Sequence, residues 1–303
     1  MDSMAAMLPY CGQEYHECQC EDNEKLNLPE FDVLPRAVAL DLDGTLLDNR
    51  TQLSERSRRA LEGCLEQGIP VIIATSRPTR IFNRVFPREL AGSCSLAVMN
   101  GAVTIGNPPL SGYFKETISE EIIRSVISLA GEFCSDTHVT LELDGYEFGV
   151  NWTPDPDFLW PRNSATLDMV LSIDEALTKQ PSKIAVSVTG EDILELKDIL
   201  DDKFGQAISV IPSLIGNPIL NITAPGASKP NALRKLLDPV GISLDEVIAF
   251  GDDLPDIGML EACGISVAMA NSFPDVKSVC SHHTASNDDD GVALVLEEML
   301  KRS

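Results

Sequence analysis

A short apolar run followed at once by two aspartates is the feature that most constrains how this sequence folds. Residues 36–48 read RAVALDLDGTLLD, and residues 37–40 are the small or branched apolar type found in buried strands. Side chains two apart point the same way in a strand, so Asp41 and Asp43 both project from its carboxyl end. Two carboxylates this close repel each other unless a cation lies between them or one is protonated. Gly44 then allows the chain to turn sharply.

This arrangement of carboxylates suits phosphoryl transfer. One carboxylate attacks the phosphoryl group, Mg2+ offsets the negative charge, and the second carboxyl protonates the leaving oxygen. The hydroxyl of Thr45 lies beside them and can hold a phosphate oxygen. A DxDG sequence also occurs in acidic turns that only reverse the chain, so the rest of the sequence has to decide between the two interpretations.

Strands and helices alternate along the chain from residue 33. Residues 69–74 and 94–99 are further apolar runs, and residues 54–67 between the first two strands have a helical pattern with Ser54 as N-cap. Pro78 opens a second helix at a position that does not need its missing N–H. This order predicts a doubly wound parallel sheet with right-handed crossovers.

Polar residues follow each of these strands. Thr75, Ser76 and Arg77 follow the second strand and Asn100 follows the third, at the edge where open parallel sheets bind ligands. We expect all four, with Thr45, to contact substrate. For Arg77 an ion pair at the start of the helix is an alternative.

The pattern changes after residue 102 to short strands of alternating polarity mixed with helices. It returns to apolar strands with residues 219–223, which we expect to rejoin the parallel sheet. The predicted division is a flexible acidic leader at 1–30, a catalytic core at 31–115 and 214–303, and an inserted α+β cap domain at 116–213. Within the cap we expect helices at 119–133, 173–178 and 191–204, strands at 138–143, 146–151, 183–189 and 207–211, and an irregular stretch at 152–165.

A second acidic group follows another buried strand. Val247 to Phe250 run into GDDLPDIGML, which contains Asp252 and Asp256. Mg2+ takes one or two carboxylates together with water and phosphate oxygens, and Asp41, Asp252 and the backbone carbonyl of Asp43 can supply this set.

A lysine at 229 follows residues 219–223 in the sequence. Lys229 would neutralise the phosphate and the nucleophile from the other side. Asp256 is a further candidate for the metal, either as a ligand or by ordering the water molecules around it.

Several motifs together resemble the Cof-type subfamily of the haloacid dehalogenase superfamily. The matching stretches are DLDGTLLD (41–48), ATSR (74–77), NGA (100–102), SKPNAL (228–233), GDDLPDIGML (251–260), VAMAN (267–271) and TASNDDDGV (284–292). The resemblance implies a Rossmann-like core with a large cap, Mg2+, and an aspartyl-phosphate intermediate. It implies Asp41 as nucleophile, Asp43 as acid/base, Thr75 and Lys229 as phosphate binders, and Asp252 as metal ligand.

The sequence departs from the family pattern at two positions. Ser76 stands where the family usually has Gly, which adds bulk and a donor near the phosphate. Pro255 stands where the GDxxND motif has Asn, so an amide side chain near the metal is missing. Pro is compatible with the first turn of the expected helix, and Asp253 or Asp256 would take over the role of the Asn.

Composition narrows the range of partners. Lys and Arg number 23 against 47 Asp and Glu, and a net charge of −24 repels nucleic acid and anionic membranes. No apolar run approaches the roughly 20 residues that span a membrane, and the first residues lack a secretory pattern. We therefore expect a cytoplasmic protein, monomer or homodimer. Cys11, Cys18 and Cys20 with His16 match no paired zinc-binding spacing.

The expected function is a Mg2+-dependent phosphatase of a small phosphorylated metabolite, such as a sugar phosphate, a nucleotide or a cofactor phosphate. Two alternatives stay open at this point: a sugar-phosphate mutase of the same superfamily, and a binding or scaffold protein whose catalysis is weakened by Pro255.

Overall fold

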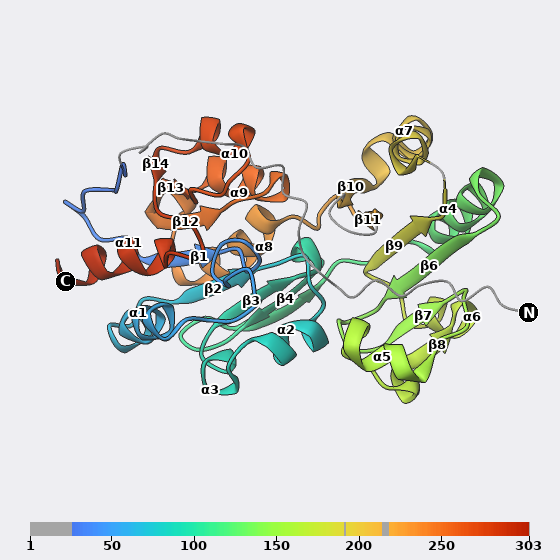
Figure 1. Ribbon diagram of the computed structural model, residues 1–303, viewed down its shortest axis with the longest axis horizontal. Coiled ribbons are helices and arrows are strands. Elements are labelled where there is room, and N and C mark those ends of the chain that lie inside the picture. Colours follow the sequence, from blue (N-terminus) through green and yellow to red (C-terminus); the bar gives the residue numbers. More distant parts are fainter. Residues whose placement is uncertain (1–25, 191, 214–217, 303) are drawn as a thin grey trace, which may run out of the picture.

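The strands that end in the acidic motifs are buried along their whole length. The computed structural model describes residues 26–190, 192–213 and 218–302, and these strands form the centre of an eight-stranded sheet in the order β14-β13-β12-β1-β2-β3-β4-β5 (Figure 1). The parallel strands are β14 (His282–His283), β13 (Ile265–Ala268), β12 (Val247–Gly251), β1 (Ala37–Leu40), β2 (Val71–Ala74) and β3 (Ser95–Val98). Because both faces of such a sheet are covered, the strands read as continuous apolar runs rather than alternating ones.

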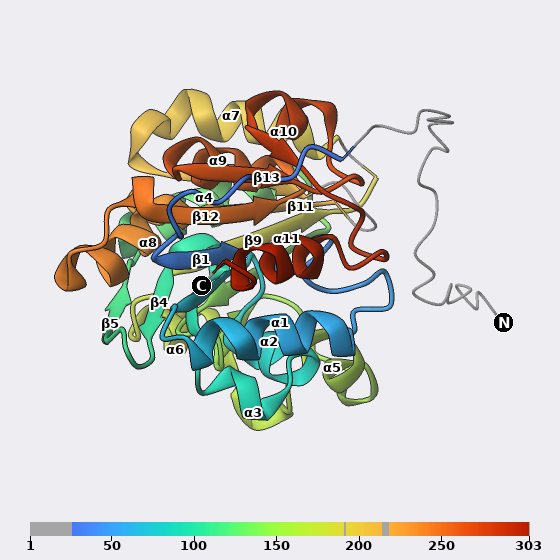
Figure 2. The ribbon, with the colours of Figure 1, turned by 90° about the vertical axis from the view of Figure 1, so that its left-hand side faces the viewer.

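Helices cover both faces of this sheet, which confirms the doubly wound α/β core. The apolar sides of α1 (Glu55–Glu66) and α11 (Gly291–Leu300) pack with one set of strand side chains, and those of α8 (Lys229–Leu237) and α9 (Ile257–Ala262) with the other. Figure 2 shows α1 and α9 on opposite sides of β1 and β12. The remaining helices and strands of the core are α2 (Thr79–Val85), α3 (Arg88–Ala91), α10 (Pro274–Val279) and the antiparallel hairpin β4 (Val103–Gly106) and β5 (Gly112–Lys115).

The inserted segment forms a second, six-stranded sheet in the order β10-β11-β9-β6-β7-β8. Its helices α4 (Glu120–Phe133) and α7 (Ile193–Phe204) cover one face only and lie on the side away from the larger sheet (Figure 1). The other face turns toward the core. The strands are β6 (Thr137–Glu142), β7 (Phe148–Val150), β8 (Val170–Ser172), β9 (Lys183–Val188), β10 (Ser209–Ser213) and β11 (Ile219–Thr223), and the short helices are α5 (Pro156–Asn163) and α6 (Ile173–Leu177).

The prediction that residues 219–223 rejoin the core sheet is wrong. These residues are β11, which pairs antiparallel with β9 and β10, so the smaller sheet extends past the boundary predicted at residue 213. Leu220 and Ile222 face the apolar cluster under α4 and α7, whereas Asn221 and Thr223 point to the other face. This alternation is typical of a strand covered on one side, not of a parallel core strand.

Two further features of the inserted segment differ from the prediction. Part of the stretch expected to be irregular is the helix α5, which begins at Pro156 after the N-cap Asp155 and accommodates Pro161 in its last turns. The three-residue strand β8 was not predicted, because so short a run shows no period.

The predicted leader is partly attached to the core. Asn27 exchanges two backbone hydrogen bonds with His283 at the end of β14, and Leu28 packs against the core side chains. Asn27 and Leu28, which the prediction placed in the leader, therefore contact the core. Cys11, Cys18, Cys20 and His16 lie outside the described residues.

The two connections between core and cap run next to each other. Glu116 follows β5, Gly226 follows β11, and a Cβ added to Gly226 would lie 3.0 Å from a carboxylate oxygen of Glu116. Glu116 also forms an ion pair with Lys235 of α8.

Within the described residues, no helix has the length and apolar character needed to cross a membrane.

A buried ion pair joins the core to the cap. The guanidinium of Arg80 on α2 donates to both carboxylate oxygens of Glu142 at the end of β6, over 2.6 and 2.7 Å. The side chains are 3% and 8% exposed. Arg80 also donates to the carbonyl oxygen of Asn163 and stacks over the ring of Phe148, 4.3 Å from its centroid.

This ion pair leads to a prediction about stability. Glu142→Gln removes the negative charge and leaves the buried guanidinium of Arg80 without its counter-charge. Breaking such a pair commonly lowers the free energy of unfolding by about 3–5 kcal/mol. We expect a loss of free energy of unfolding toward that range, measured by urea denaturation. The control is Glu120→Gln, which breaks an exposed pair with Arg124 on α4 and should have little effect. Equal losses in both variants would contradict the assignment.

Candidate active site

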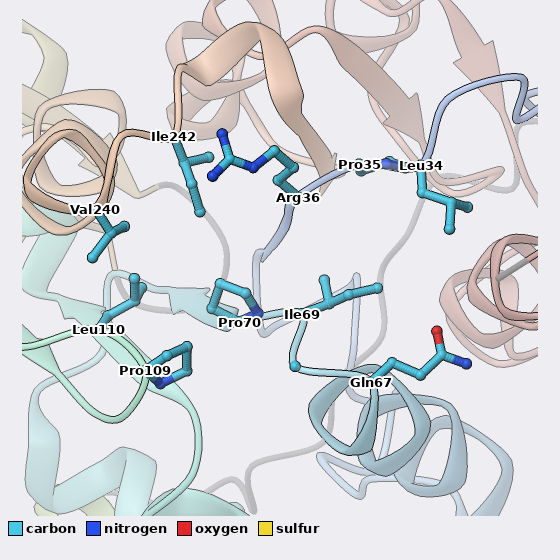
Figure 3. Close-up of a pocket in the computed structure, with 11 residues that line it drawn as sticks. Leu34, Pro35, Arg36, Gln67, Ile69, Pro70, Pro109, Leu110, Val240 and Ile242 are labelled. Atoms are coloured by element: carbon cyan, nitrogen blue, oxygen red, sulfur yellow. The ribbon is translucent and has the colours of Figure 1, made fainter.

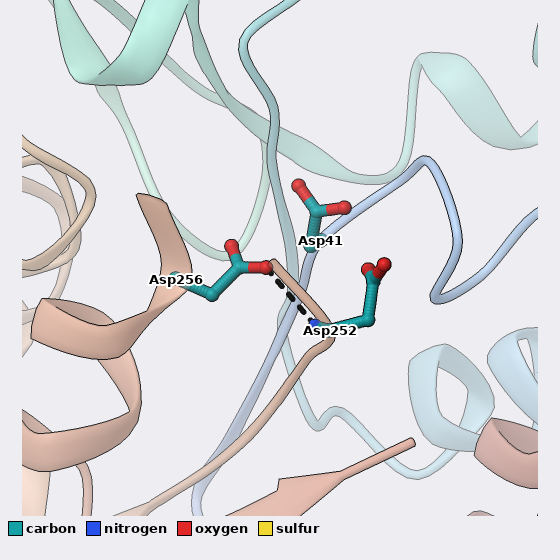
Figure 4. A group of neighbouring side chains, drawn as sticks. All are labelled: Asp41, Asp252 and Asp256. Carbon is teal, nitrogen blue, oxygen red and sulfur yellow. Dashed lines mark hydrogen bonds between the residues drawn. The ribbon is translucent and has the colours of Figure 1, made fainter. Parts of the chain in front are cut away.

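The predicted site residues meet at one edge of the larger sheet. Asp41 follows β1, Thr75 follows β2, and Asp252 follows β12, and these three strands are neighbours in the order β12-β1-β2. Parallel strands end at the same edge, so residues far apart in the sequence lie together there. Asp41, Asp252 and Asp256 each offer a carboxylate oxygen, and these oxygens lie within 4.8 Å of one another (Figure 4).

Lys229 lies among these carboxylates. It is the first residue of α8, whose N-cap Ser228 accepts a hydrogen bond from the backbone of Asn231. Its ammonium donates to Oδ1 of Asp41 and to Oδ1 of Asp256, each over 2.5 Å. All three side chains are almost completely buried, so these contacts are little screened by water.

Asp256 uses both of its oxygens on groups of the protein. While Oδ1 accepts from Lys229, Oδ2 accepts from the backbone N–H groups of Asp252 and Asp253, each over 3.1 Å. The bond from Asp252 is the dashed line in Figure 4. Asp256 therefore fixes both the ammonium and the turn that carries Asp252. Pro255 lies in the same turn, in the first positions of a short 3₁₀ helix at 254–256. The predicted helical start with Pro255 is confirmed.

Burial and mutual repulsion shift the acidities of this group. Burial, the nearby Asp256 carboxylate and its other acidic neighbours hold the pKa of Asp41 well above its usual range, although Lys229 acts in the opposite direction. Burial and Asp256 raise the pKa of Asp252 to about 7. Burial alone would lower the pKa of Lys229, but Asp256 and Asp41 outweigh it and raise it. The site favours a lower net negative charge than its three carboxylates provide.

The turn after Asp41 fits closely against Asp252. Gly44 has a φ of +75°, and a Cβ there would lie 2.3 Å from Oδ2 of Asp252, so only glycine is tolerated. The hydroxyl of Thr45 donates to Oδ1 of Asp252 over 2.7 Å. Thr45, predicted to contact substrate, is thus directed at the Asp252 carboxylate.

Asp43 lies at the more open side of the site and is paired with Arg77. Nε of Arg77 donates to Oδ2 of Asp43 over 2.6 Å, and a second nitrogen donates to Oδ1. The Asp43 side chain is 41% exposed, in contrast to Asp41. For Arg77 the structure shows the ion pair that the sequence left as an alternative to phosphate contact.

The loops after β2 and β3 support each other. The hydroxyl oxygen of Thr75 accepts from the backbone N–H of Arg77, which leaves its proton available for a ligand. The backbone N–H of Asn100 donates to the carbonyl oxygen of Thr75, and Asn100 has a φ of +58°. Its side-chain Oδ1 is buried and has no partner within the described residues.

Ser76 is exposed, and its carbonyl accepts from Lys183 of the cap over 3.3 Å.

Asn271, Asn287 and Lys183 have contacts at the site that no sequence pattern predicted. Nδ2 of Asn271 donates to the carbonyl oxygen of Gly44 over 2.7 Å, and Oδ1 of Asn271 accepts from the backbone N–H of Asn287. Asn271 thus holds the turn that carries the aspartates. Its place after the strand β13 was the available signal. Lys183 opens a strand of the cap, and nothing in its local sequence indicates the contact to Ser76.

The residues present fit a divalent cation. Asp41, Asp252, Asp256 and Lys229 carry three negative charges and one positive charge when ionised, and hard carboxylate oxygens are the ligands that Mg2+ prefers. Since Asp256 already accepts from three donors, Asp41 and Asp252 are the carboxylates best placed for the metal.

A separate hollow lies at the opposite edge of the same sheet. It is lined by the residues that precede β1 and β2, such as Arg36 and Pro70, together with Leu110, Val240 and Ile242 (Figure 3). Its volume is about 540 Å³. Apart from Arg36 and Gln67 its lining side chains are apolar, and it contains no carboxylate, so it is not the site of the acidic motifs.

The raised pKa of Asp252 predicts how stability depends on pH. In the folded protein Asp252 keeps its proton up to about pH 7, while its ordinary pKa is 3.8. Between these values the folded state binds more protons than the unfolded state, so this residue lowers the free energy of unfolding as the pH rises. Without divalent cations, Asp252→Asn should become more stable relative to the wild type from about pH 4 to pH 7.

Urea denaturation in EDTA at several pH values measures this difference. Asp202→Asn, an exposed substitution on α7, is the control and should show no such trend. A difference between Asp252→Asn and wild type that stays constant with pH would contradict the assignment.

Comparison with known proteins agrees with this site. A model of the haloacid dehalogenase-like hydrolase family matches residues 38–296. The 5-amino-6-(5-phospho-D-ribitylamino)uracil phosphatase YitU of Bacillus subtilis is 26% identical over 266 residues, which are 87% of this chain and 97% of that protein. Phosphatase YwpJ of Bacillus subtilis is 27% identical over 300 residues, covering 88% of this chain and all of that protein.

Solved structures agree as well. The crystal structure of TM0651 from Thermotoga maritima is similar with a TM-score of 0.72 and 27% identity, over 87% of this chain and 97% of that one. BT1666 from Bacteroides thetaiotaomicron is described among phosphatases of the haloalkanoate superfamily. Its structure is similar with a TM-score of 0.71 and 26% identity, over 90% of this chain and 97% of that one. The chain therefore belongs to the haloacid dehalogenase-like hydrolases, of the Cof type that its motifs indicate.

Proposed function

We propose that this hydrolase is a Mg2+-dependent phosphatase that removes phosphate from a small phosphorylated metabolite through an aspartyl-phosphate intermediate. The observation that carries the proposal is the geometry of Asp41. Its Oδ1 is held by Lys229, while Oδ2 accepts no hydrogen bond within the described part of the chain. An oriented carboxylate with one free oxygen is the arrangement a nucleophile requires.

Lys229 and Asp256 prepare the nucleophile for attack. The ammonium favours the ionised form of Asp41 in a buried site that otherwise disfavours it. It also lies where it can neutralise the charge of the incoming phosphoryl group, because it donates to the attacking residue itself. Asp256 keeps the ammonium in place from the other side.

Asp43 is proposed as the acid/base. It projects from the same strand end as Asp41 but is more exposed, so it can reach the leaving oxygen and later the attacking water. The guanidinium of Arg77 donates to both carboxylate oxygens of Asp43 and so fixes the orientation of the group that would protonate the leaving oxygen and then take a proton from the attacking water. Arg77 thus acts on the reaction by positioning Asp43.

Thr75 and Asn100 are proposed to hold the phosphoryl oxygens. The hydroxyl of Thr75 still has its proton to donate, and the side chain of Asn100 is buried with an unpaired oxygen. Ser76 is exposed beside them and adds a further donor.

Mg2+ is proposed to be held by Asp41, Asp252 and the backbone carbonyl of Asp43, and it would offset the negative charge that develops on the phosphoryl oxygens. Thr45 and Asp256 serve this set indirectly, because both hold Asp252 in position.

Relatives support the reaction class. Two of the similar proteins are named phosphatases, and one acts on a phosphorylated ribitylaminouracil, a small metabolite. The complete set of Asp41, Asp43, Asp252 and Lys229 in one site favours catalysis over a scaffold role. No feature of the described residues favours a mutase.

The nucleophile and acid/base assignments predict distinct losses of activity. Asp41→Asn keeps the shape of the side chain but cannot attack, so hydrolysis of para-nitrophenyl phosphate with Mg2+ should fall to background, as it should for the wild type in EDTA. Asp43→Asn should lower kcat by roughly 10²–10⁴-fold, the usual contribution of acid/base catalysis. Asp202→Asn is the control. Near-normal turnover by Asp41→Asn would refute the covalent mechanism.

Asp256 and Pro255 provide a second test. Asp256→Asn removes one of the two carboxylates that hold Lys229. Loss of such supporting contacts commonly lowers activity or metal affinity by about 10–100-fold, and we expect a fall in kcat of that size. Pro255→Asn restores the residue usual in the family and should change kcat and the Mg2+ concentration for half-maximal rate little, because Asp256 already fixes the turn. A large gain of activity in Pro255→Asn would show that the missing amide limits the site.

A further inference from the structure

A second buried charge cluster lies where the cap meets the core, outside the acidic site. It contains Arg80 of α2, Glu142 at the end of β6 and Lys183 at the start of β9. Glu142 and Lys183 are cross-strand neighbours in the cap sheet. Lys183 is 6% exposed and is as deeply buried as the ion pair beside it.

The cluster is not balanced in charge. It holds two cations and one carboxylate, and both oxygens of Glu142 are already taken by Arg80. Within the described residues Lys183 forms no ion pair, and its one hydrogen bond runs to the carbonyl oxygen of Ser76, over 3.3 Å. An ammonium has three donors, and buried charges are normally paired. Lys183 therefore keeps donors and a positive charge that no carboxylate of the described residues balances.

The acidity of Lys183 agrees with this count. Burial lowers the pKa of Lys183 to about 8, and the attraction of Glu142 does not make up for burial and the repulsion of Arg80. Lys229, which is equally buried but has two carboxylates, shows the opposite shift. The difference between the two lysines is the presence of counter-charge.

Lys183 points from the cap toward the loop that carries site residues. Thr223, Lys183 and Glu142 are in register across β11, β9 and β6, so their side chains share the face of the cap sheet that α4 and α7 leave uncovered. The hydroxyl of Thr223 is buried there without a partner within the described residues. Ser76, which Lys183 contacts, lies between Thr75 and Arg77.

We propose that Lys183 binds a second anionic group of the substrate, a carboxylate or a further phosphate on the part that leaves after hydrolysis. This inference rests on the proposed phosphatase function and adds the substrate class, phosphate esters with another negative charge. The incoming anion replaces the long contact to the Ser76 carbonyl and completes the charge balance with Arg80 and Glu142. The Thr223 hydroxyl on the neighbouring strand supplies a further donor.

Paired substrates that differ in one carboxylate test this assignment. Phenyl phosphate carries no charge besides its phosphate and 4-carboxyphenyl phosphate carries a carboxylate on the same ring, and glycerol 3-phosphate and 3-phosphoglycerate form a second pair. The wild type should prefer the carboxylate-bearing member of a pair in kcat/KM. In Lys183→Met this preference should fall by roughly 10–100-fold, the usual contribution of a hydrogen bond to a charged group, and mainly through KM.

Control variants separate charge from packing. Lys179→Met removes an exposed cap lysine that pairs with Glu147, and it should leave the preference unchanged. Lys183→Gln keeps a donor without the charge and should lose the preference as Lys183→Met does. Thermal unfolding shows whether each variant is folded.

Each outcome decides between the proposals. If the wild type hydrolyses the neutral esters but Lys183→Met keeps the preference for the anionic ones, or loses both activities equally, the assignment of Lys183 is overturned and the phosphatase function stands. If the wild type hydrolyses no ester with Mg2+, the phosphatase function fails and the inference falls with it.

Discussion

The contact of the Lys229 ammonium with Asp41 and Asp256 is the interaction on which the acidic site depends. Without a cation between them, carboxylates brought this close in a buried place would repel each other and take up protons. With Lys229 in place, one oxygen of Asp41 is fixed and the other is free. Asp256 transmits the same constraint to Asp252 through two backbone N–H groups. One ammonium therefore orders residues that are up to 215 positions apart in the sequence.

The parallel sheet is what makes that contact possible. β12, β1 and β2 end at one edge, and α8 begins there. Asp41 and Thr75 therefore meet Lys229 and Asp252, although the cap sequence lies between the two pairs. The required precision comes from close packing at the turns. Gly44 leaves only enough space for the Asp252 carboxylate, and Asn271 in the loop after β13 donates to the Gly44 carbonyl oxygen.

The parts that the sequence predicted are those with a strong local signal. Fully apolar runs ending in polar residues located the core strands and, with them, Asp41 and Asp252. Lys229 was identified by the stretch SKPNAL at 228–233. Residues 219–223 were assigned to the wrong sheet because an apolar pentapeptide does not show which strand it pairs with. Thr45 donates to Asp252, and Arg77 pairs with Asp43. These contacts join residues far apart in the sequence, so no local pattern predicts them.

The acidic site around Asp41 and the buried cluster of Arg80, Glu142 and Lys183 have opposite imbalances of charge. In a chain with a net charge of −24, a negatively charged substrate is attracted only where basic side chains gather locally. Arg77, Arg80, Lys183 and Lys229 come from different elements, yet Lys183 and Arg77 meet at the same short loop and Lys229 meets Asp41 in the same site. The acidic site around Asp41 has more negative than positive charge, and the cluster of Arg80, Glu142 and Lys183 has more positive than negative charge. Under the proposed function a metal would balance the first and an anionic group of the substrate the second, and recognition of the substrate would then be divided between core and cap.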